Sequence, residues 1–420
     1  DFSIDIFLNR FYLSLFLTVF FDFPSHFLPF SILYFFWLII FYVFGLYDLR
    51  AVKAGPFFYT KIFGSILACF MVGIAFFYLI PLFGITPKTS LVLNIAILSI
   101  LFSGWRKIFS LLFSAHFLNR VIIVGEGQQT RELAKEIELR PYLGYKLINL
   151  DQHQNLLSQI QNKKIDTIII PSDIKDSSSL VESLYQCFPA RVNFLDWTKA
   201  YEIICNKIPV AFITHAWFLE NIKEGEKSFY DKAKQGIDKI LALVLLIVTS
   251  PLWPVIALLI KLGDGGPILY RQERIGKDKK PFFLFKFRSM NVGAESKTGP
   301  VWSAKEDPRV TKVGRLLRKA HLDELPQMIN VLKGDIGLVG PRPERPEFVE
   351  KLEKEIPHYH IRHLIKPGFT GWAQIKFRYG RSVMDSQEKF QYDLYYLKNR
   401  SPLLDLGILL KTIQLFFKKE

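Results

Sequence analysis

The stretch His321-Leu322-Asp323-Glu324-Leu325-Pro326-Gln327 places two carboxylates side by side just before a predicted helix. Pro326 is tolerated in a first helical turn and Gly334 can take the left-handed conformation that ends a helix, so we expect a helix from about Leu325 to Lys333. Asp323 and Glu324 then lie at its N-terminus, where the helix dipole favours ionised carboxylates and free N–H groups can hold a phosphate oxygen.

An ionised Asp can attack phosphorus, and a neighbouring carboxylate can hold a divalent metal. An isolated Asp-Glu pair is more often a helix cap with a surface charge. Here, however, cations precede the pair over some fifty residues, and together they can neutralise a diphosphate and a developing phosphoryl charge. These residues are Arg271, Arg274, Lys286, Arg288, Arg315 and Arg318.

Six motifs that surround the carboxylate pair occur in a fixed order. They are Gly266 to Gly276 (GPILYRQERIG), Phe285 to Met290 (FKFRSM), Asp307 to Thr311 (DPRVT), Leu322 to Gln327 (LDELPQ), Asn330 to Asp335 (NVLKGD) and Val339 to Pro343 (VGPRP). Together they resemble the bacterial sugar transferases, the polyprenyl-phosphate hexose-1-phosphate transferases. The resemblance covers roughly Tyr230 to the C-terminus. The chain is also similar to the large members of that family, which carry N-terminal helices and a nucleotide-fold domain.

The resemblance implies an enzyme that moves a hexose-1-phosphate from a UDP-sugar onto polyprenyl (undecaprenyl) phosphate and so initiates exopolysaccharide, capsule or O-antigen assembly. It implies that Asp323 attacks the β-phosphorus and that Glu324 helps to hold Mg²⁺. Lys286 and Arg288 would be phosphate ligands, and Arg342, between Pro341 and Pro343, would position the nucleotide. Arg378 stands where the family tends to carry an arginine near the uridine diphosphate. The sequence departs from the family at Lys376-Phe377-Arg378. It also departs at His321, where Ser or Thr is usual, and at Gly337, where Ser is usual.

Composition favours a membrane protein independently of the family. Half of the residues are hydrophobic and 39 of 420 are Phe, with the excess in the first hundred residues. Residues 1–118 are predicted to form a transmembrane region of four helices, with three as the alternative because Arg10 interrupts the first segment. The apolar segments are Ile6 to Phe21, Leu28 to Leu46, Ile62 to Ile85 and Leu91 to Trp105.

Basic residues predict the orientation of these segments. Arg50, Lys53 and Lys61 lie between the second and third segments, whereas the first and third loops hold only Lys88. By the positive-inside rule we expect everything after Trp105 to be cytoplasmic. The family resemblance implies that the membrane is a bacterial inner membrane. The net charge of +15 fits an anionic leaflet and diphosphate substrates. Nucleic-acid binding would also explain the charge but would leave the four predicted spans without a role, so we expect no nucleic-acid partner. No cleavable signal peptide is evident, and because Asp1 is not a start residue, chain upstream of it is an open alternative.

The middle of the chain, residues 119–215, is predicted to be a small Rossmann-like, doubly wound domain. Arg120 to Gly127 reads as a buried strand that enters a glycine turn, and the helical pattern Thr130 to Glu138 follows. Further strands are expected at Lys146 to Leu150, Thr167 to Pro171 and Arg191 to Leu195. The third glycine of the dinucleotide fingerprint is absent, although Asp151 stands where a ribose-binding acid would lie. This favours a non-catalytic, structural or regulatory domain. Three cysteines, Cys69, Cys187 and Cys205, have no ligand spacing.

A second membrane segment is expected after a charged linker, residues 216–236. Within the predicted catalytic domain, 237–420, the run 240–262 is apolar but holds Ser250-Pro251 and Pro254 at its middle. Proline removes a backbone donor, so the run is either a kinked spanning helix or a re-entrant hairpin broken at Ser250 and Pro251. Basic residues on both flanks favour the re-entrant form. The family resemblance implies it as well.

The predicted fold is therefore a membrane protein of α and α/β class, with N-terminal transmembrane helices, the Rossmann-like domain, and an α-rich catalytic domain with a re-entrant helix. The tail Tyr392 to Glu420 is expected to form a helix that lies in the membrane interface or packs on the catalytic core. Two alternative functions stay open: a membrane nucleotide-binding sensor or scaffold, and an NAD-dependent nucleotide-sugar oxidoreductase. The residues specify neither the sugar nor the oligomeric state, and a homodimer is compatible with the sequence.

Overall fold

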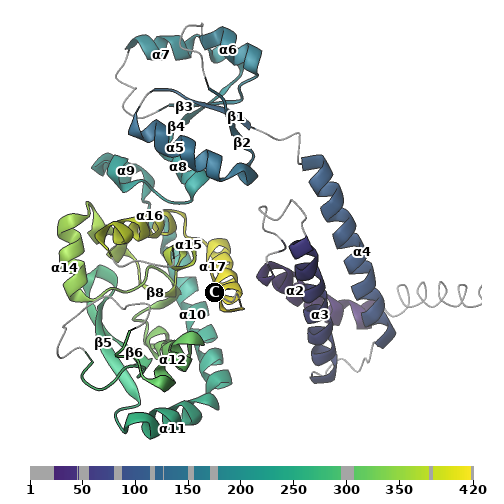
Figure 1. The fold of residues 1–420 in the computed structure, drawn as a ribbon, viewed down its shortest axis with the longest axis vertical. Helices are drawn as coiled ribbons and strands as arrows, with labels where there is room; N and C mark the ends of the chain where they lie inside the picture. The colour runs from purple at the N-terminus through teal and green to yellow at the C-terminus, as the bar shows by residue number, and fades with distance from the viewer. Residues whose placement is uncertain are drawn as a thin grey trace, which may run out of the picture. The chain divides into compact units, whose positions relative to one another are not determined.

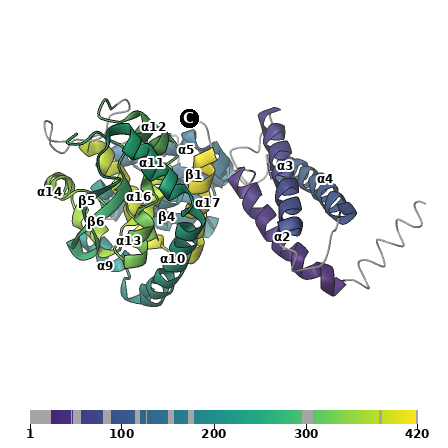
Figure 2. The ribbon, with the colours of Figure 1, turned by 90° about the horizontal axis from the view of Figure 1, so that it is seen from below.

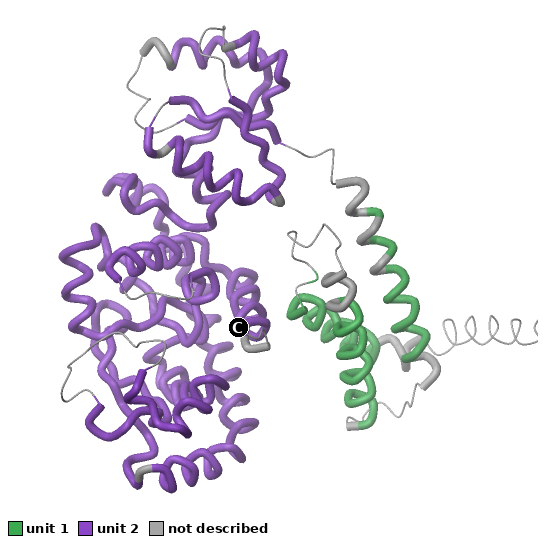
Figure 3. The backbone as a smooth tube through the Cα atoms, in the orientation of Figure 1, with its two compact units in different colours: residues 1–118 green, residues 119–420 purple. Residues whose placement is uncertain are grey.

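The computed structural model describes residues 23–44, 46, 56–79, 88–113, 119–125, 127–149, 156–170, 178–294, 307–377 and 382–417. The chain divides into two compact units, residues 1–118 and residues 119–420 (Figure 3). The predicted first apolar segment, Ile6 to Phe21, lies outside the described residues, as do Asp151 and Arg378.

In the described part of the first unit three helices pack together, α2 (Phe23–Val43), α3 (Pro56–Leu79) and α4 (Lys88–Phe113), seen together in Figure 2. Trp37 is buried between them and its indole N–H donates to the carbonyl of Cys69 over 3.0 Å. Tyr34 donates to Asn94 Oδ1 over 2.7 Å. Polar atoms of these apolar helices therefore find partners on neighbouring helices.

The outward faces of these helices are also apolar, with Phe35, Phe63 and Ile100 more than half exposed. Among the residues that the structure describes, however, no single helix has the length and hydropathy needed to cross a bilayer. The described apolar stretches, Leu28–Val43, Ile62–Tyr78 and Leu91–Leu101, hold 10–17 residues each. They are shorter than the predicted segments, so the four spans stay a prediction.

The second unit begins with a four-stranded parallel sheet of order β2-β1-β3-β4. Its strands are β1 (Asn119–Ile123), β2 (Tyr145–Leu147), β3 (Thr167–Ile170) and β4 (Asn193–Asp196), and its helices are α5 (Gln128–Leu139), α6 (Leu156–Lys163), α7 (Ser178–Tyr185) and α8 (Trp197–Cys205). Helices α5 and α8 cover one face and α6 and α7 the other (Figure 1). The predicted α/β part with a parallel sheet is confirmed. The fourth strand begins two residues later than expected, after Arg191 at φ 54°.

Residues 206–236, which include the predicted linker 216–236, are largely ordered into helix. α9 (His215–Asn221) and the first turns of α10 (Ser228–Thr249) lie there. Ile208 and Val210 are buried against Leu352 and Phe390 of the C-terminal part. The indole N–H of Trp372 donates to the carbonyl of Asn206 over 2.9 Å. This stretch therefore packs on the predicted catalytic domain.

The predicted break at Ser250 and Pro251 is present. α10 ends at Thr249, α11 (Leu252–Asp264) follows, and the two helical segments are bent by 64° (Figure 1). Pro251 has no N–H to donate to the carbonyl of Ile247 four residues back, and the Ser250 hydroxyl donates to that carbonyl instead, over 2.7 Å. Only taken together do these two segments reach the length and hydropathy of a membrane segment.

The rest of the chain builds the core around short strands. Its elements are β5 (Leu269–Ile275), β6 (Pro281–Phe287), α12 (Lys312–Lys319), α13 (Gln327–Lys333), β7 (Gly337–Val339), α14 (Pro346–Glu355), β8 (Gly368–Thr370), α15 (Trp372–Lys376), α16 (Val383–Asn399) and α17 (Pro402–Phe417). β5 pairs antiparallel with β6, and β7 pairs parallel with β8. Ile408 of α17 is fully buried in this core, whereas Leu403 is 80% exposed. The tail thus packs on the catalytic core and keeps an apolar outer face.

Candidate active site

The two carboxylates occupy a turn of their own. Leu322–Glu324 form a 3-10 turn, η9, which starts after His321 in the left-handed conformation (φ 54°), and α13 begins only at Gln327. The predicted helix from Leu325 was therefore placed two residues too early, because Pro326 precedes rather than opens the helix. Gly334 ends α13 at φ 86°, as expected.

Asp323 and Glu324 have different surroundings. Both cations that reach this turn bind Oε1 of Glu324: Lys286 Nζ at 2.7 Å and Arg342 Nη2 at 2.9 Å. Asp323 is only 7% exposed, yet among the described residues no group donates a hydrogen bond to its carboxylate. Glu324 is thus fixed by its partners, while the carboxylate of Asp323 is held in place by the backbone and is free to react.

Asp323 and Glu324 also differ in the direction in which their pKa values are shifted. Burial raises the pKa of Asp323, and the neighbouring charge of Glu324 raises it again, against the opposing effect of Lys286 and Arg318. Burial would also raise the pKa of Glu324, but Lys286 and Arg342 outweigh it and hold that pKa well below its ordinary value. Glu324 therefore stays ionised, and Asp323 is the more basic and more nucleophilic of the two.

Lys286 is placed by the hairpin β5–β6 and by one side chain of α13. Asn330 is fully buried; its Oδ1 accepts from the N–H of Phe285 over 3.0 Å, and its Nδ2 donates to the carbonyl of Phe283 over 2.7 Å. These bonds join β6 to the helix that follows the carboxylate turn. Lys286 comes next in the strand, so the register of β6 against Asn330 sets its reach to Glu324.

Arg342 lies in a short loop, residues 341–343, in which every backbone carbonyl accepts a hydrogen bond. The carbonyls of Pro341, Arg342 and Pro343 accept from Gly368 N at 2.9 Å, Arg362 Nη2 at 3.0 Å and Arg274 Nη1 at 3.0 Å. The two prolines have no N–H and need no acceptor. The loop is therefore rigid, and the structure gives Arg274 a part in holding it.

Glycines allow this loop to approach β8 closely. A Cβ on Gly368 would lie 2.1 Å from the nitrogen of Gly340, and a Cβ on Gly371 would lie 2.1 Å from the oxygen of Gly340. No larger residue fits there without moving the backbone. The close contacts of Gly368 and Gly371 with Gly340 thus help to set the position of Arg342.

The remaining predicted cations are dispersed. Arg318 donates to Ser289 Oγ over 2.8 Å and affects the pKa of Asp323, so it lies near the pair. Arg288 is buried beside Gly266, and Arg271 lies over the ring of Phe283. Arg315 is exposed on α12, and within the described part of the chain its side chain contacts neither carboxylate. Arg378 falls outside that part.

The structure adds residues that sequence reasoning missed. A groove that contains Arg342 is also lined by Gln374, Lys389 and Asp393. Buried Arg362 spans it, with hydrogen bonds to Tyr359 Oη at 2.6 Å and Asp393 Oδ2 at 2.8 Å. These residues come from η10 (Tyr359–Leu364), α15 and α16, so no local motif could have joined them.

Comparison with known proteins shows the family to which the chain belongs. Residues 229–419 match the family model described as bacterial sugar transferase. The exopolysaccharide production protein PSS of Rhizobium leguminosarum bv. phaseoli is 37% identical over 185 residues, which cover 43% of this chain and 92% of that protein. The chain belongs to the bacterial sugar transferase family.

Two longer members of the family are also similar. The UDP-glucose:undecaprenyl-phosphate glucose-1-phosphate transferase of Escherichia coli K12 is 32% identical over 310 residues, 70% of this chain and 66% of that protein. The UDP-N-acetylgalactosamine-undecaprenyl-phosphate N-acetylgalactosaminephosphotransferase of Aeromonas hydrophila is 44% identical over 185 residues, 44% of each. The chain thus spans less than two thirds of the length of both transferases.

The structure shows the surroundings of two positions, His321 and Gly337, at which this chain departs from its family. His321 takes the left-handed conformation that starts the carboxylate turn. A Cβ on Gly337 would lie 2.8 Å from Asp238 Oδ2, so a serine there would require the carboxylate to shift. The departure at Gly337 therefore fits the position of α10 against β7.

The donor set of this site suits Mg²⁺ in part. Lys286 and Arg342 both contact Oε1 of Glu324, which leaves Oε2 and the unpartnered carboxylate of Asp323 as oxygen ligands. No group of three metal-binding side chains is found among the described residues. Mg²⁺ is commonly held by one or two carboxylates together with substrate phosphates, so the residues fit an ion that arrives with a diphosphate.

Proposed function

We propose that this chain is a phosphoglycosyl transferase that moves a hexose-1-phosphate from a UDP-sugar to undecaprenyl phosphate. The observation that carries the proposal is the carboxylate turn, where a buried, unpartnered Asp323 adjoins a Glu324 fixed by two cations. The names of the transferases from E. coli and A. hydrophila support the same donor and acceptor classes. Family membership favours this function over a sensor or an oxidoreductase.

In the first step an oxygen of Asp323 attacks the β-phosphorus of the UDP-sugar. A bond forms between that oxygen and phosphorus, the bond from phosphorus to the bridging oxygen breaks, and UMP leaves with the electron pair. The raised pKa of Asp323 makes its carboxylate the better nucleophile of the two. Lys286 and Arg342 lie where they can stabilise charge on the phosphoryl oxygens.

In the second step an oxygen of the lipid phosphate attacks the same phosphorus. The bond from phosphorus to Asp323 breaks, the carboxylate is restored, and the product is a sugar linked to the lipid by a diphosphate. The free side of Asp323 suits this exchange, because no protein hydrogen bond has to break when the carboxylate reacts.

The groove beside Arg342 is proposed to take the nucleotide of the donor. Lys389 and Gln374 line it, and Gln374 Oε1 is a buried acceptor without a hydrogen-bond donor in the described part. Arg378 stays a candidate for the same nucleotide. A rigid loop, clamped at three carbonyls, presents Arg342 between this groove and the carboxylates.

Mg²⁺ is proposed as the cofactor, with Glu324 as its protein ligand. It would neutralise the repulsion between the donor diphosphate and the carboxylates. EDTA should therefore stop transfer and Mg²⁺ restore it. Unchanged rates in chelator would contradict this role.

We also propose that the protein sits at the cytoplasmic face of the inner membrane, with α10 and α11 forming a re-entrant hairpin. Ile240 and Val248 of α10 and Val255 and Leu258 of α11 are more than half exposed, which leaves a continuous apolar surface on both arms. Such a hairpin would bring the acceptor lipid to the reaction centre.

Transfer is tested directly with purified protein, a panel of radiolabelled UDP-sugars and undecaprenyl phosphate. We expect one or a few sugars to appear in the lipid fraction with release of UMP. Asp323→Asn should lower turnover by about 10³-fold or more while the protein stays folded. Full activity of that variant would exclude the covalent route, and absence of transfer from every donor would exclude the function.

A further inference from the structure

A second basic site lies beside α10, at the other end of α13 from the carboxylates. A hollow that is partly open to solvent is bounded by Val331 and Gly334 at the end of that helix. Asp323 and Glu324 precede the first residue of α13, and seven residues of helix extend about 10 Å. The hollow is therefore separate from the reaction centre.

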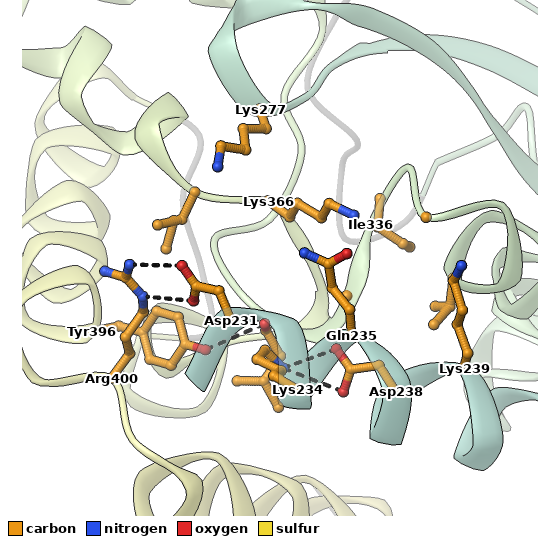
Figure 4. Close-up of a pocket in the computed structure, with 15 residues that line it drawn as sticks. Asp231, Lys234, Gln235, Asp238, Lys239, Lys277, Ile336, Lys366, Tyr396 and Arg400 are labelled. Carbon is orange, nitrogen blue, oxygen red and sulfur yellow. Dashed lines mark hydrogen bonds and ion pairs between the residues drawn. The ribbon is translucent and has the colours of Figure 1, made fainter. Parts of the chain in front are cut away.

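The two carboxylates that line the hollow are each paired with a cation. Asp238 Oδ2 pairs with Lys234 at 2.9 Å and accepts from Leu338 N over 3.2 Å. Asp231 pairs with Arg400 at 3.1 Å. Figure 4 shows both pairs. Lys234 also pairs with Asp405 at 3.1 Å and Arg400 with Glu224 at 2.7 Å, so each of these cations is shared between two carboxylates.

Three further lysines surround the hollow from three parts of the chain. Lys239 comes from α10, Lys277 from the turn of the β5–β6 hairpin, and Lys366 from the segment before β8 (Figure 4). In the described part of the chain none of them makes an ion pair or a side-chain hydrogen bond. The residues that line the hollow thus include five cations and two carboxylates.

These lysines are close enough to repel one another. Burial lowers the pKa of Lys366, and Lys239 and Lys277 lower it further, while Asp335 and Asp238 offset only part of the effect. An anion among the three amines would relieve this repulsion. In Figure 4 the side chain of Lys366 lies between the labelled Lys277 and Lys239.

The hollow also adjoins the apolar surface of α10. Lys239 directly precedes Ile240, which is 64% exposed and begins the apolar arm of the hairpin. If the hairpin is re-entrant, Lys239 lies at the depth of the lipid headgroups. This part of the argument rests on the proposed membrane location.

We propose that Lys239, Lys277 and Lys366 form a site for a phosphate group that is distinct from the reaction centre. The source is either the headgroup of an anionic phospholipid in the leaflet entered by α10 and α11, or a free phosphate compound. In the first case the site anchors the catalytic domain at a fixed depth through charge–headgroup contacts.

The test measures thermal unfolding of the purified full chain, by tryptophan fluorescence, against added dioctanoyl-phosphatidylglycerol, dioctanoyl-phosphatidylcholine or glycerol 3-phosphate. Phosphatidylglycerol should raise the unfolding temperature far more than phosphatidylcholine. In the triple variant Lys239→Gln, Lys277→Gln, Lys366→Gln, the concentration of lipid for the half-maximal shift should rise at least about tenfold. The control is Lys280→Gln, Lys351→Gln, Lys354→Gln, which removes the same charge from exposed positions.

If glycerol 3-phosphate raises the unfolding temperature as much as phosphatidylglycerol does, and the triple variant weakens both effects equally, the site binds a free phosphate compound. Equal shifts in the triple variant and the wild type, or no anion-dependent shift at all, would overturn the proposal. Asp323→Asn serves as the second background. It should lose transfer but keep the lipid shift, so failure of the lysine site and failure of the proposed function give different results.

Discussion

At the scale of single residues, the carboxylate turn separates two tasks between neighbours. Glu324 binds cations through one oxygen, and Asp323 keeps its carboxylate free. Two adjacent carboxylates would otherwise repel each other, and their protonation equilibria would be coupled. Lys286 breaks the symmetry because it lies within an ion-pair distance of Glu324 only.

Lys286→Met should lower the rate of transfer at neutral pH by about 10²-fold. Lys286 lowers the pKa of Glu324 and of Asp323, so its removal raises both. Because the active forms are ionised, the variant should lose activity at a higher pH than the wild type as the pH falls. The pH profile of kcat/KM measures this, with Lys280→Met on the same hairpin as the control; an acidic limb that does not move would refute the assignment.

Asn330 is the residue that joins the hairpin to the helix. Asn330→Ala would leave the N–H of Phe285 and the carbonyl of Phe283 without partners, at a cost to the free energy of unfolding of about 2–4 kcal/mol. Because Lys286 would then lose its register, kcat should fall as well. Thermal unfolding and kcat are compared with Lys333→Gln on the same helix. A stable, fully active Asn330→Ala protein would contradict this role.

At the scale of elements, the bend between α10 and α11 follows from one missing N–H. Pro251 cannot donate to the carbonyl of Ile247, and the hydroxyl of Ser250 takes its place. Pro254 lies in the first turn of α11, where its missing N–H leaves no carbonyl unsatisfied. The bend should therefore depend on Pro251 and not on Pro254.

Pro251→Leu should straighten the segment in part of the molecules and lower activity, whereas Pro254→Leu should change little. Labelling of intact cells with a membrane-impermeant thiol reagent reports the topology, after the three native cysteines are replaced. Single cysteines at Ser228 and Lys277, which are both exposed, should resist labelling in the wild-type background. Labelling at position 277 but not at 228 would show that the hairpin crosses the membrane.

At the scale of the whole molecule, the α/β part and the catalytic part share contacts. Lys398 pairs with Glu202 at 2.7 Å, and Lys207 pairs with Glu388 at 2.8 Å. Ile208 and Val210 fill a cluster that includes Phe390 and Leu394. We therefore expect an independently folding catalytic domain to need the residues from Asn206 onward.

A chain that begins at Asn206 should fold and keep transferase activity in detergent, because the missing fingerprint glycine argues against chemistry in the α/β sheet. A chain that begins at Ser228 should unfold at a lower temperature, since it exposes the cluster around Phe390. Unfolding temperature and turnover of the two proteins decide the matter. An inactive but folded Asn206 chain, together with nucleotide binding by the α/β part, would instead indicate a working site there.

Features that depend on local chemistry follow from the amino-acid sequence alone. Pro251 lacks an N–H wherever it stands, Gly334 reaches positive φ at no cost, and alternating strand and helix patterns predict the parallel sheet. The adjacent carboxylates were likewise visible as a motif, although the start of the helix after them was misplaced by two residues. Each of these features involves residues that are neighbours in the chain.

Which cations reach the carboxylates depends instead on tertiary packing. Arg342 contacts Glu324 because three distant donors hold the carbonyls of its loop, whereas Arg271, equally prominent in the sequence, lies over Phe283. Lys239, Lys277 and Lys366 gather around one hollow from three separate elements. Side-chain proximity of this kind depends on strand register and on packing between residues far apart in the chain, and neither is encoded in a local pattern.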